Sequence, residues 1–134
     1  MKIIFFGEDS FSLLALKSLH ESKHTILQVL CPLYMNSIHR KLEKYCSVNS
    51  IDFNLRKEFS SEKFIRKIKN QNPDLLVVCH FQKLLKKELI EIPSFGAINL
   101  HPSMLPKYRG MSPQHWPIIN GEKYTGITVH YIDE

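Results

Sequence analysis

Residues 96–110 read GAINLHPSMLPKYRG, and the rest of the chain is organised around this stretch. Its apolar start, residues 97–100, predicts a buried strand, and the polar, turn-forming residues that follow predict a loop. Ligands bind at the carboxyl edge of strands in α/β sheets, so we expect functional side chains here. Asn99 and His101 are two residues apart, which places them on the same face of the strand. An amide and an imidazole can donate, accept and transfer protons. An isolated pair of this kind is, however, more often a capping Asn and a structural His.

Apolar runs alternate with amphipathic segments along the whole chain. We predict strands at residues 2–6, 26–30, 51–55, 75–78, 97–100 and 126–132. We predict helices at residues 11–19, from Asn36 to about Ser50, at 62–70, a short one through Glu91, and one from Ser112 to Asn120. Continuously apolar strands that alternate with helices are typical of an α/β fold. The predicted architecture is one domain, residues 1–134, with a doubly wound, mostly parallel sheet and helices on both faces.

Turn and capping residues predict where these elements begin and end. Asp9 or Ser10 suits the N-cap of the first helix, and Ser60 suits that of the helix at 62–70. Ser112 followed by Pro113 is typical of a helix start, and residues 31–32, Cys-Pro, predict the end of the second strand. Gly7 after the first strand stands alone, without a G-x-G-x-x-G pattern, so we predict no NAD site.

The composition is that of a globular protein, with a net charge of +5. The charge is spread over several helical segments, so it favours anionic ligands without predicting a nucleic-acid module. Three widely spaced cysteines predict reduced, mostly buried thiols, and seven histidines without zinc-ligand spacing predict no metal site. With no signal-like or membrane-spanning run, we expect a cytoplasmic protein with no membrane partner.

The stretch at 96–110 continues in a pattern through Trp116, Asn120-Gly121-Glu122 and residues 126–130, GITVH. This pattern resembles the folate-dependent formyltransferase family, which includes glycinamide ribonucleotide, methionyl-tRNA and sugar-nucleotide formyltransferases. The resemblance implies a Rossmann-like formyltransferase fold and 10-formyltetrahydrofolate as the formyl donor. It also implies that Asn99 and His101 are catalytic. Asn99 would donate to the formyl oxygen, and His101 would stabilise the oxyanion and transfer a proton.

The resemblance assigns two further groups of residues. The formyl-donor wall would consist of Phe81, Gln82, Lys83, Leu84, Leu85, Ile132 and Asp133. The acceptor side would consist of Ser103, Lys107, Tyr108, Arg109 and Trp116. Simpler interpretations stay open for three of them: a strand-end cap for Asp133, a solvated Arg109 and a core Trp116.

The identity of the acceptor amine depends on departures from the family pattern. Glu8 and Asp9 stand where the glycinamide ribonucleotide enzymes carry a phosphate loop, and two acids would repel phosphate. The insertion that methionyl-tRNA enzymes carry after the second strand is missing at residues 31–36. The residues Lys107, Tyr108, Arg109, Trp116 and Glu122 fit the sugar-nucleotide enzymes. We therefore expect a nucleotide-linked amino sugar as the acceptor. The alternatives are methionyl-tRNA, with tRNA as partner, or an inactive fragment. A homodimer is compatible with the resemblance.

One family residue has no counterpart in this chain. The resemblance implies a catalytic Asp seven residues after His130, at position 137, whereas the sequence ends at Glu134. Asp133 occupies a different position in the pattern and does not take that role. We therefore expect a formyltransferase domain whose C-terminal part is missing, and we expect its activity alone to be doubtful because catalytic residues act together.

Overall fold

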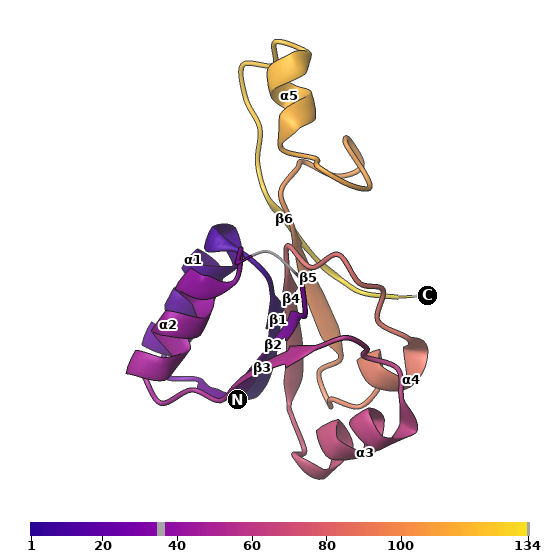
Figure 1. Cartoon of the computed structure of the whole chain (residues 1–134). Helices are drawn as coiled ribbons and strands as arrows, with labels where there is room; N and C mark the ends of the chain where they lie inside the picture. The colour runs from indigo at the N-terminus through magenta and orange to yellow at the C-terminus, as the bar shows by residue number, and fades with distance from the viewer. Residues whose placement is uncertain (35–36, 134) are drawn as a thin grey trace.

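The computed structural model describes residues 1–34 and 37–133. Its six strands form one sheet in the order β3-β2-β1-β4-β5-β6 (Figure 1). The first five strands are parallel, and β6 runs antiparallel to β5. The strands are β1 (Lys2–Gly7), β2 (Thr25–Pro32), β3 (Phe53–Arg56), β4 (Leu75–Cys79), β5 (Ala97–His101) and β6 (Thr128–Tyr131). The predicted mostly parallel α/β sheet is confirmed.

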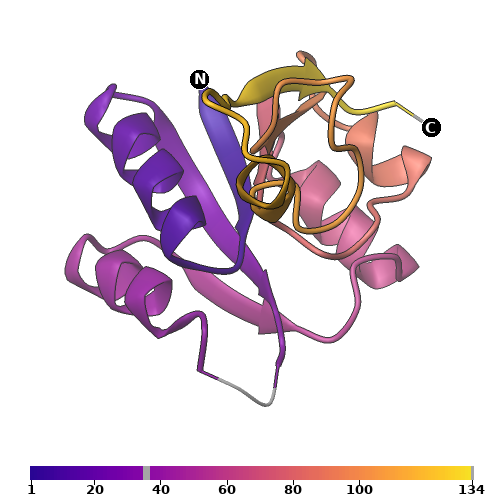
Figure 2. The ribbon, with the colours of Figure 1, turned by 90° about the horizontal axis from the view of Figure 1, so that it is seen from above.

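Helices cover both faces of this sheet. They are α1 (Ser10–Glu21), α2 (Arg40–Val48), α3 (Glu62–Asn70), α4 (Lys87–Ile90) and α5 (His115–Ile119). Two of them, α1 and α2, lie together on one face, whereas α3 and α4 lie on the other (Figures 1 and 2). The fifth, α5, belongs to a segment that projects beyond the ends of β5 and β6 (Figure 1). In the described part of the chain, no helix is long and apolar enough to cross a membrane.

The central strands are buried on both faces because helices pack against each. In β1, Ile3 and Phe5 face one side with Leu16 of α1 and Leu42 of α2. Alternate residues of the same strand pack on the opposite side with Phe64 and Ile68 of α3 and Leu89 of α4. Strands buried in this way read as continuous apolar runs, which is why they were recognisable from the sequence. The three cysteines are unpaired and buried, as expected.

Several predicted boundaries are wrong. Residues 31–32 continue β2, because Pro32 is its last residue and still pairs in register with Arg56. The N-cap of α3 is Ser61, whose hydroxyl accepts a 3.4 Å hydrogen bond from the Phe64 amide. The predicted helix start at Asn36 lies outside the described residues, and α2 begins at Arg40.

The last helix also begins later than predicted. Ser112 has a φ of +54°, which a helical N-cap does not adopt. Its carbonyl instead accepts a 3.1 Å hydrogen bond from the His115 amide, which closes a turn before the helix. As a result α5 starts at His115 with Gln114 at its N-cap, and it ends at Ile119 with the expected Asn120 at its C-cap.

Candidate active site

Three loops meet at the carboxyl edge of the sheet. The chain leaves β1 toward β2 and β3 on one side, whereas β4 and β5 lie on the other side of β1. The strand order therefore reverses beside β1 and β4, and ligands of open α/β sheets bind at such a switch point. Residues 8–9, 80–82 and 99–101 follow or end these strands. The topology thus places them at one edge.

Asn99 is held by a residue on the neighbouring strand. Its Nδ2 donates a 3.2 Å hydrogen bond to Nε2 of His130, which lies opposite it on β6. Nδ1 of His130 donates in turn to the Tyr131 carbonyl at 2.7 Å, so the neutral ring offers Nε2 as an acceptor. One amide hydrogen and the carbonyl oxygen of Asn99 remain for another partner.

His101 is fixed by the loop that follows it. Its Nε2 donates a 3.0 Å hydrogen bond to the Tyr108 carbonyl, which leaves Nδ1 for other groups. The buried Ser103 hydroxyl donates to the Lys107 carbonyl at 2.8 Å and closes the same loop. Ser103, predicted to bind substrate, therefore shapes the loop behind His101.

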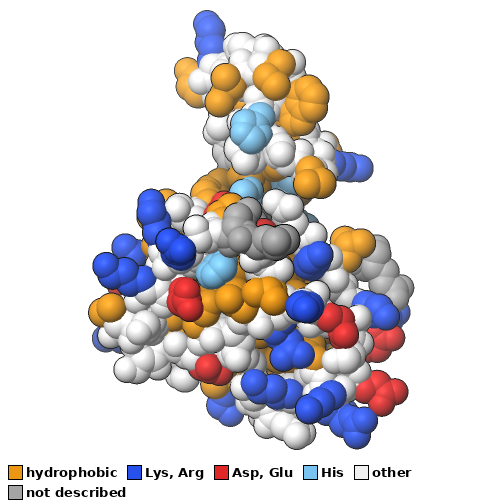
Figure 3. All heavy atoms as spheres, in the orientation of Figure 1, with side chains coloured by type: hydrophobic (Ala, Val, Ile, Leu, Met, Phe, Trp, Pro, Cys, Tyr) orange, Lys and Arg blue, Asp and Glu red, His pale blue; other side chains and the backbone are white. Residues whose placement is uncertain are grey.

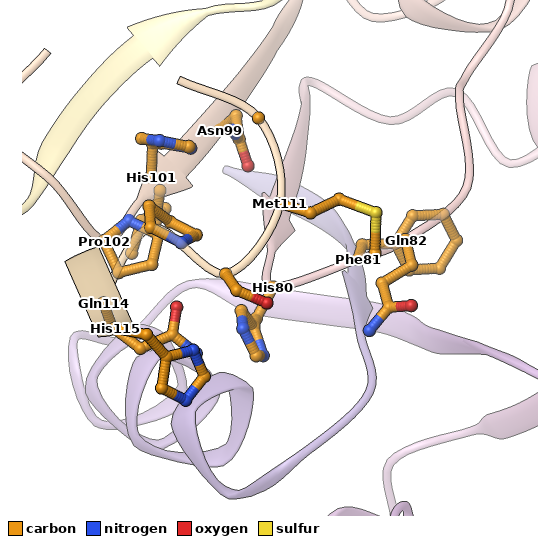
Figure 4. A pocket seen from close by; sticks show the side chains of 13 residues that line it. His80, Phe81, Gln82, Asn99, His101, Pro102, Met111, Gln114 and His115 are labelled. Atoms are coloured by element: carbon orange, nitrogen blue, oxygen red, sulfur yellow. The ribbon is translucent and has the colours of Figure 1, made fainter. Parts of the chain in front are cut away.

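Two adjoining hollows share the predicted catalytic pair. The larger hollow has a volume of about 830 Å³ and is lined by Asn99, His101 and Arg109 together with most of the predicted formyl-donor wall. The wall residues that line it are Phe81, Gln82, Lys83, Leu84 and Asp133. The smaller, of about 320 Å³, is lined by Asn99 and His101 together with His80, Gln114 and His115, among others (Figure 4). Leu85 and Ile132 instead pack against the core beneath the wall.

Most of the residues predicted for the acceptor side lie outside both hollows. Lys107 Nζ lies 3.3 Å from the Glu122 carboxylate, and the Tyr108 hydroxyl donates to the same carboxylate at 2.6 Å. These hydrogen bonds lower the pKa of Glu122. Trp116 is 47% exposed on α5 and lines neither hollow. Of the five predicted residues, Arg109 alone reaches either hollow.

The sequence interpretation missed a histidine–carboxylate pair at this edge. Nδ1 of His80 is hydrogen-bonded to Oδ2 of Asp9, although the two residues are 71 positions apart. The interaction raises the pKa of His80 against the opposing effect of burial. Burial on its own would raise the pKa of Asp9, but the hydrogen bonds from His80 and Ser12 lower it overall. The available signal was that both residues follow strands beside the switch point.

The neighbouring acid, Glu8, ties two loops together. It is 2% exposed, and its carboxylate accepts hydrogen bonds from the Gln82 amide and the Tyr34 hydroxyl. Burial raises its pKa, partly opposed by these two donors. Among the residues that the structure describes, no group of three His, Cys, Asp or Glu side chains could hold a metal ion.

Comparison with known proteins identifies the family. A family described as "Formyl transferase" matches residues 1–134. The methionyl-tRNA formyltransferase of Clostridioides difficile (strain 630) is 39% identical over 149 residues, which cover 100% of this chain and 45% of that protein. The enzyme of the same name from Thermodesulfovibrio yellowstonii is 38% identical over 98% of this chain and 45% of its own length. The chain thus spans about half the length of these curated relatives.

Solved structures share the fold at lower identity. The phosphoribosylglycinamide formyltransferase of Bacillus halodurans superposes with a TM-score of 0.80 at 19% identity, covering 100% of this chain and 73% of that one. A formyltetrahydrofolate deformylase from Pseudomonas syringae gives 0.76 at 22% identity, covering 99% and 46%. With the family match over its whole length and a fold shared with these enzymes, the chain belongs to the formyl transferase family.

Proposed function

We propose that this chain carries the formyl-transfer site of a methionyl-tRNA formyltransferase. It would bind 10-formyltetrahydrofolate in the larger hollow and pass the formyl group to the amino group of methionyl-tRNA in the cytoplasm. The observation that carries the proposal is that Asn99 and His101, at the end of β5, line both hollows at once. Two reactants that enter from either side would therefore meet at this pair.

The larger hollow suits the formyl donor. Its volume of about 830 Å³ falls within the range of small-molecule sites. Phe81, Leu105 and Met111 provide an apolar lining, whereas Gln82 and Asp133 add polar atoms. Such a mixture suits a pterin ring, which has flat apolar faces and a polar edge. The donor supplies an activated formyl group, and the chain supplies the groups that orient it.

The polar atoms that are free for a ligand give Asn99 and His101 different roles. Asn99 has one Nδ2 hydrogen left after its bond to His130, and we assign this hydrogen to the formyl oxygen. His101 has Nδ1 left after its bond to the Tyr108 carbonyl, and a protonated ring would donate from this atom to the oxyanion that develops. Both side chains are held in place before any ligand arrives, which is what electrostatic stabilisation of a transition state requires.

The acceptor assignment rests on the relatives. Those reported above are named methionyl-tRNA formyltransferases, which favours this acceptor over the nucleotide-linked amino sugar expected from the sequence. Two of the residues that suggested a sugar nucleotide, Lys107 and Tyr108, contact Glu122 and line neither hollow, which also favours methionyl-tRNA. The net charge of +5 is compatible with an RNA partner.

The proposal is tested with the purified chain and three acceptors. We expect saturable calorimetric binding of a non-reactive folate analogue, and formyl transfer from 10-formyltetrahydrofolate to methionyl-tRNA. His101→Ala should retain folate binding and lose at least about a hundredfold in transfer. His24→Ala, at the opposite edge of the sheet beside the start of β2, is the matched control.

Each alternative has its own result. Transfer to UDP- or dTDP-linked amino sugars, without transfer to methionyl-tRNA, would restore the sugar-nucleotide interpretation. Folate binding without transfer to any acceptor would identify an inactive, folate-binding chain. Either result, or the absence of both binding and transfer, would overturn the proposal.

A further inference from the structure

We propose that Asp9 and His80 form a dyad that takes a proton from the acceptor amine, so that the amine attacks the formyl group as a neutral nucleophile. The inference rests on the proposed function and adds a proton acceptor to it. An amine is mostly protonated near neutral pH and has no free electron pair in that form. A formyl-transfer site therefore needs a base close to the amine, in addition to the groups that hold the formyl oxygen.

The geometry places a free imidazole nitrogen next to the catalytic pair. Nδ1 of His80 is bound to Asp9, and no described residue makes a hydrogen bond with Nε2. His80 lines the smaller hollow together with Asn99 and His101 (Figure 4). A carboxylate on one ring nitrogen sets the tautomer and leaves the other nitrogen as a base, which is the arrangement of histidine bases in general.

Both members of the dyad are held by the local fold. Oδ1 of Asp9 accepts 3.0 Å hydrogen bonds from the amides of Phe11 and Ser12 at the start of α1, whereas Oδ2 contacts His80. The ring of Phe11 packs edge-on against His80, with the centroids 5.9 Å apart. His80 has a φ of +50°, a conformation that non-glycine residues rarely adopt and that clusters at functional sites.

The surrounding charges favour proton uptake. The hydrogen bond with Asp9 raises the pKa of His80, and the charge of Glu8 acts in the same direction. The other titratable groups that face the same hollow are His101 and His115. A raised pKa makes the neutral His80 ring a stronger proton acceptor than an ordinary imidazole.

The proton and electron balance is complete without a further reagent. The ammonium gives one proton to Nε2 of His80, and the freed electron pair forms a bond to the formyl carbon. The bond from that carbon to the donor nitrogen then breaks, and the second proton of the attacking nitrogen ends on the leaving nitrogen. His80 releases its proton to solvent, so one formamide, one deformylated donor and one proton are formed.

The kinetic test uses His80→Gln and Asp9→Asn in the whole chain, with His20→Gln as the matched control. Asn remains a good N-cap, so Asp9→Asn should leave α1 intact. His20 is hydrogen-bonded to the Tyr45 hydroxyl and lines neither hollow. We expect His80→Gln to lower the single-turnover rate with methionyl-tRNA at least tenfold, with folate affinity unchanged. For Asp9→Asn we expect the rising limb of the pH–rate profile to move to lower pH. His20→Gln should match the wild type.

A second measurement decides the inference without turnover. In the ¹⁵N-labelled chain with a folate analogue bound, L-methioninamide serves as the amine probe, and the imidazole nitrogens are followed by NMR. We expect a saturable shift at Nε2 of His80 that is weakened in Asp9→Asn. If the wild type transfers formyl groups and His80→Gln retains its rate and pH profile, the dyad is refuted while the proposed function stands. If the wild type transfers nothing, the proposed function fails. In that case an unshifted His80 signal also refutes the dyad, and a shifted one supports it as the amine-binding base.

Discussion

Asn99 and His130 lie directly opposite each other across the β5–β6 pair, and the Asn99 amide donates a 3.2 Å hydrogen bond to the His130 ring. The acceptor nitrogen of His130 is defined because the other ring nitrogen donates to the Tyr131 carbonyl. The only antiparallel strand of the described sheet therefore determines which way the Asn99 amide points. Its contribution to the site is orientation.

His130→Phe should lower formyl transfer about tenfold while changing the free energy of unfolding by at most about 1.5 kcal/mol, the usual net value of one hydrogen bond. Phe keeps the ring shape and removes the acceptor, so Asn99 loses its fixed orientation. The rate at saturating substrate and a urea titration give the two quantities. His20→Phe, at a residue that lines neither hollow, is the comparison. A His130→Phe variant with the wild-type rate would show that Asn99 is oriented without its help.

Arg109 and Lys107 should behave differently although they are two residues apart. Arg109 lines the larger hollow, whereas Lys107 is paired with Glu122. We expect Arg109→Ala to raise the KM for 10-formyltetrahydrofolate about tenfold at low salt, which is the loss of one charge-assisted contact, and the difference should shrink at high salt. Lys107→Ala should stay within about twofold. Equal effects of the two substitutions would contradict this assignment.

Ser12 joins the first helix to the end of β4. Its buried hydroxyl donates a 2.7 Å hydrogen bond to the Cys79 carbonyl and accepts one of 3.1 Å from the Glu8 amide. Ser12→Ala removes both buried hydrogen bonds and should lower the free energy of unfolding by about 1–3 kcal/mol. Ser22→Ala, at the exposed end of α1, should change it by less than about 0.5 kcal/mol. Urea denaturation measures both, and equal values would contradict the proposed role of Ser12.

The His80–Asp9 pair should make stability depend on pH in two opposite ways. The pKa of His80 is raised, so its contribution is complete below the ordinary value near 6.5 and is lost as the pH rises through the folded value. The pKa of Asp9 is lowered, so its contribution is complete above 3.8 and is lost as the pH falls through the folded value. The pair therefore stabilises the fold most between these two limits.

The measurement compares the wild type with His80→Gln by urea denaturation at pH 5.5 and pH 8.5. We expect the wild type to lose more stability than the variant on going to the higher pH. An identical pH dependence in the two proteins would show that His80 titrates without coupling to folding.

Local patterns were sufficient for the parallel part of the sheet and for the position of Asn99 and His101 on β5. The apolar runs of β1 and β4 announce strands buried on both faces, and the two-residue spacing of Asn99 and His101 places both at the ligand edge. The direction of β6 was not predictable in this way, because a short alternating strand can pair in either sense. The start of α5 was missed because Ser112 and Pro113 satisfy the rules for a helix start but form a turn instead.

Contacts between distant segments account for the features of the site that local patterns did not reveal. Lys107 and Tyr108 were expected to face a ligand, but Glu122, at least fourteen positions away, contacts both. Asp9 was identified correctly as a helix cap, yet only one of its oxygens has that role. Its other partner, His80, is brought close by the strand order, which no local pattern reveals. When a side chain has both a local and a long-range role, sequence rules identify only the local one.

The projecting segment that contains α5 carries several exposed hydrophobic side chains. Met111, Trp116, Ile118 and Ile119 are all exposed on or next to α5. Figure 3 shows hydrophobic side chains gathered on this part of the molecule, with histidines where it joins the body. These residues stay exposed because α5 projects beyond the ends of β5 and β6 and does not pack on a face of the sheet (Figure 1).

The formyl-donor wall is anchored at two consecutive residues. The ring of Phe81 packs edge-on against Phe6 and Phe59 at centroid distances of 5.3 and 5.1 Å, and the Gln82 amide donates to the buried Glu8 carboxylate. One anchor is apolar and belongs to the core, whereas the other is polar and belongs to the loop after β1. A ligand that binds here therefore meets a rigid surface and loses little affinity to the ordering of a loop. Mutations of core aromatic residues that do not contact a ligand should for the same reason change the shape of the pocket.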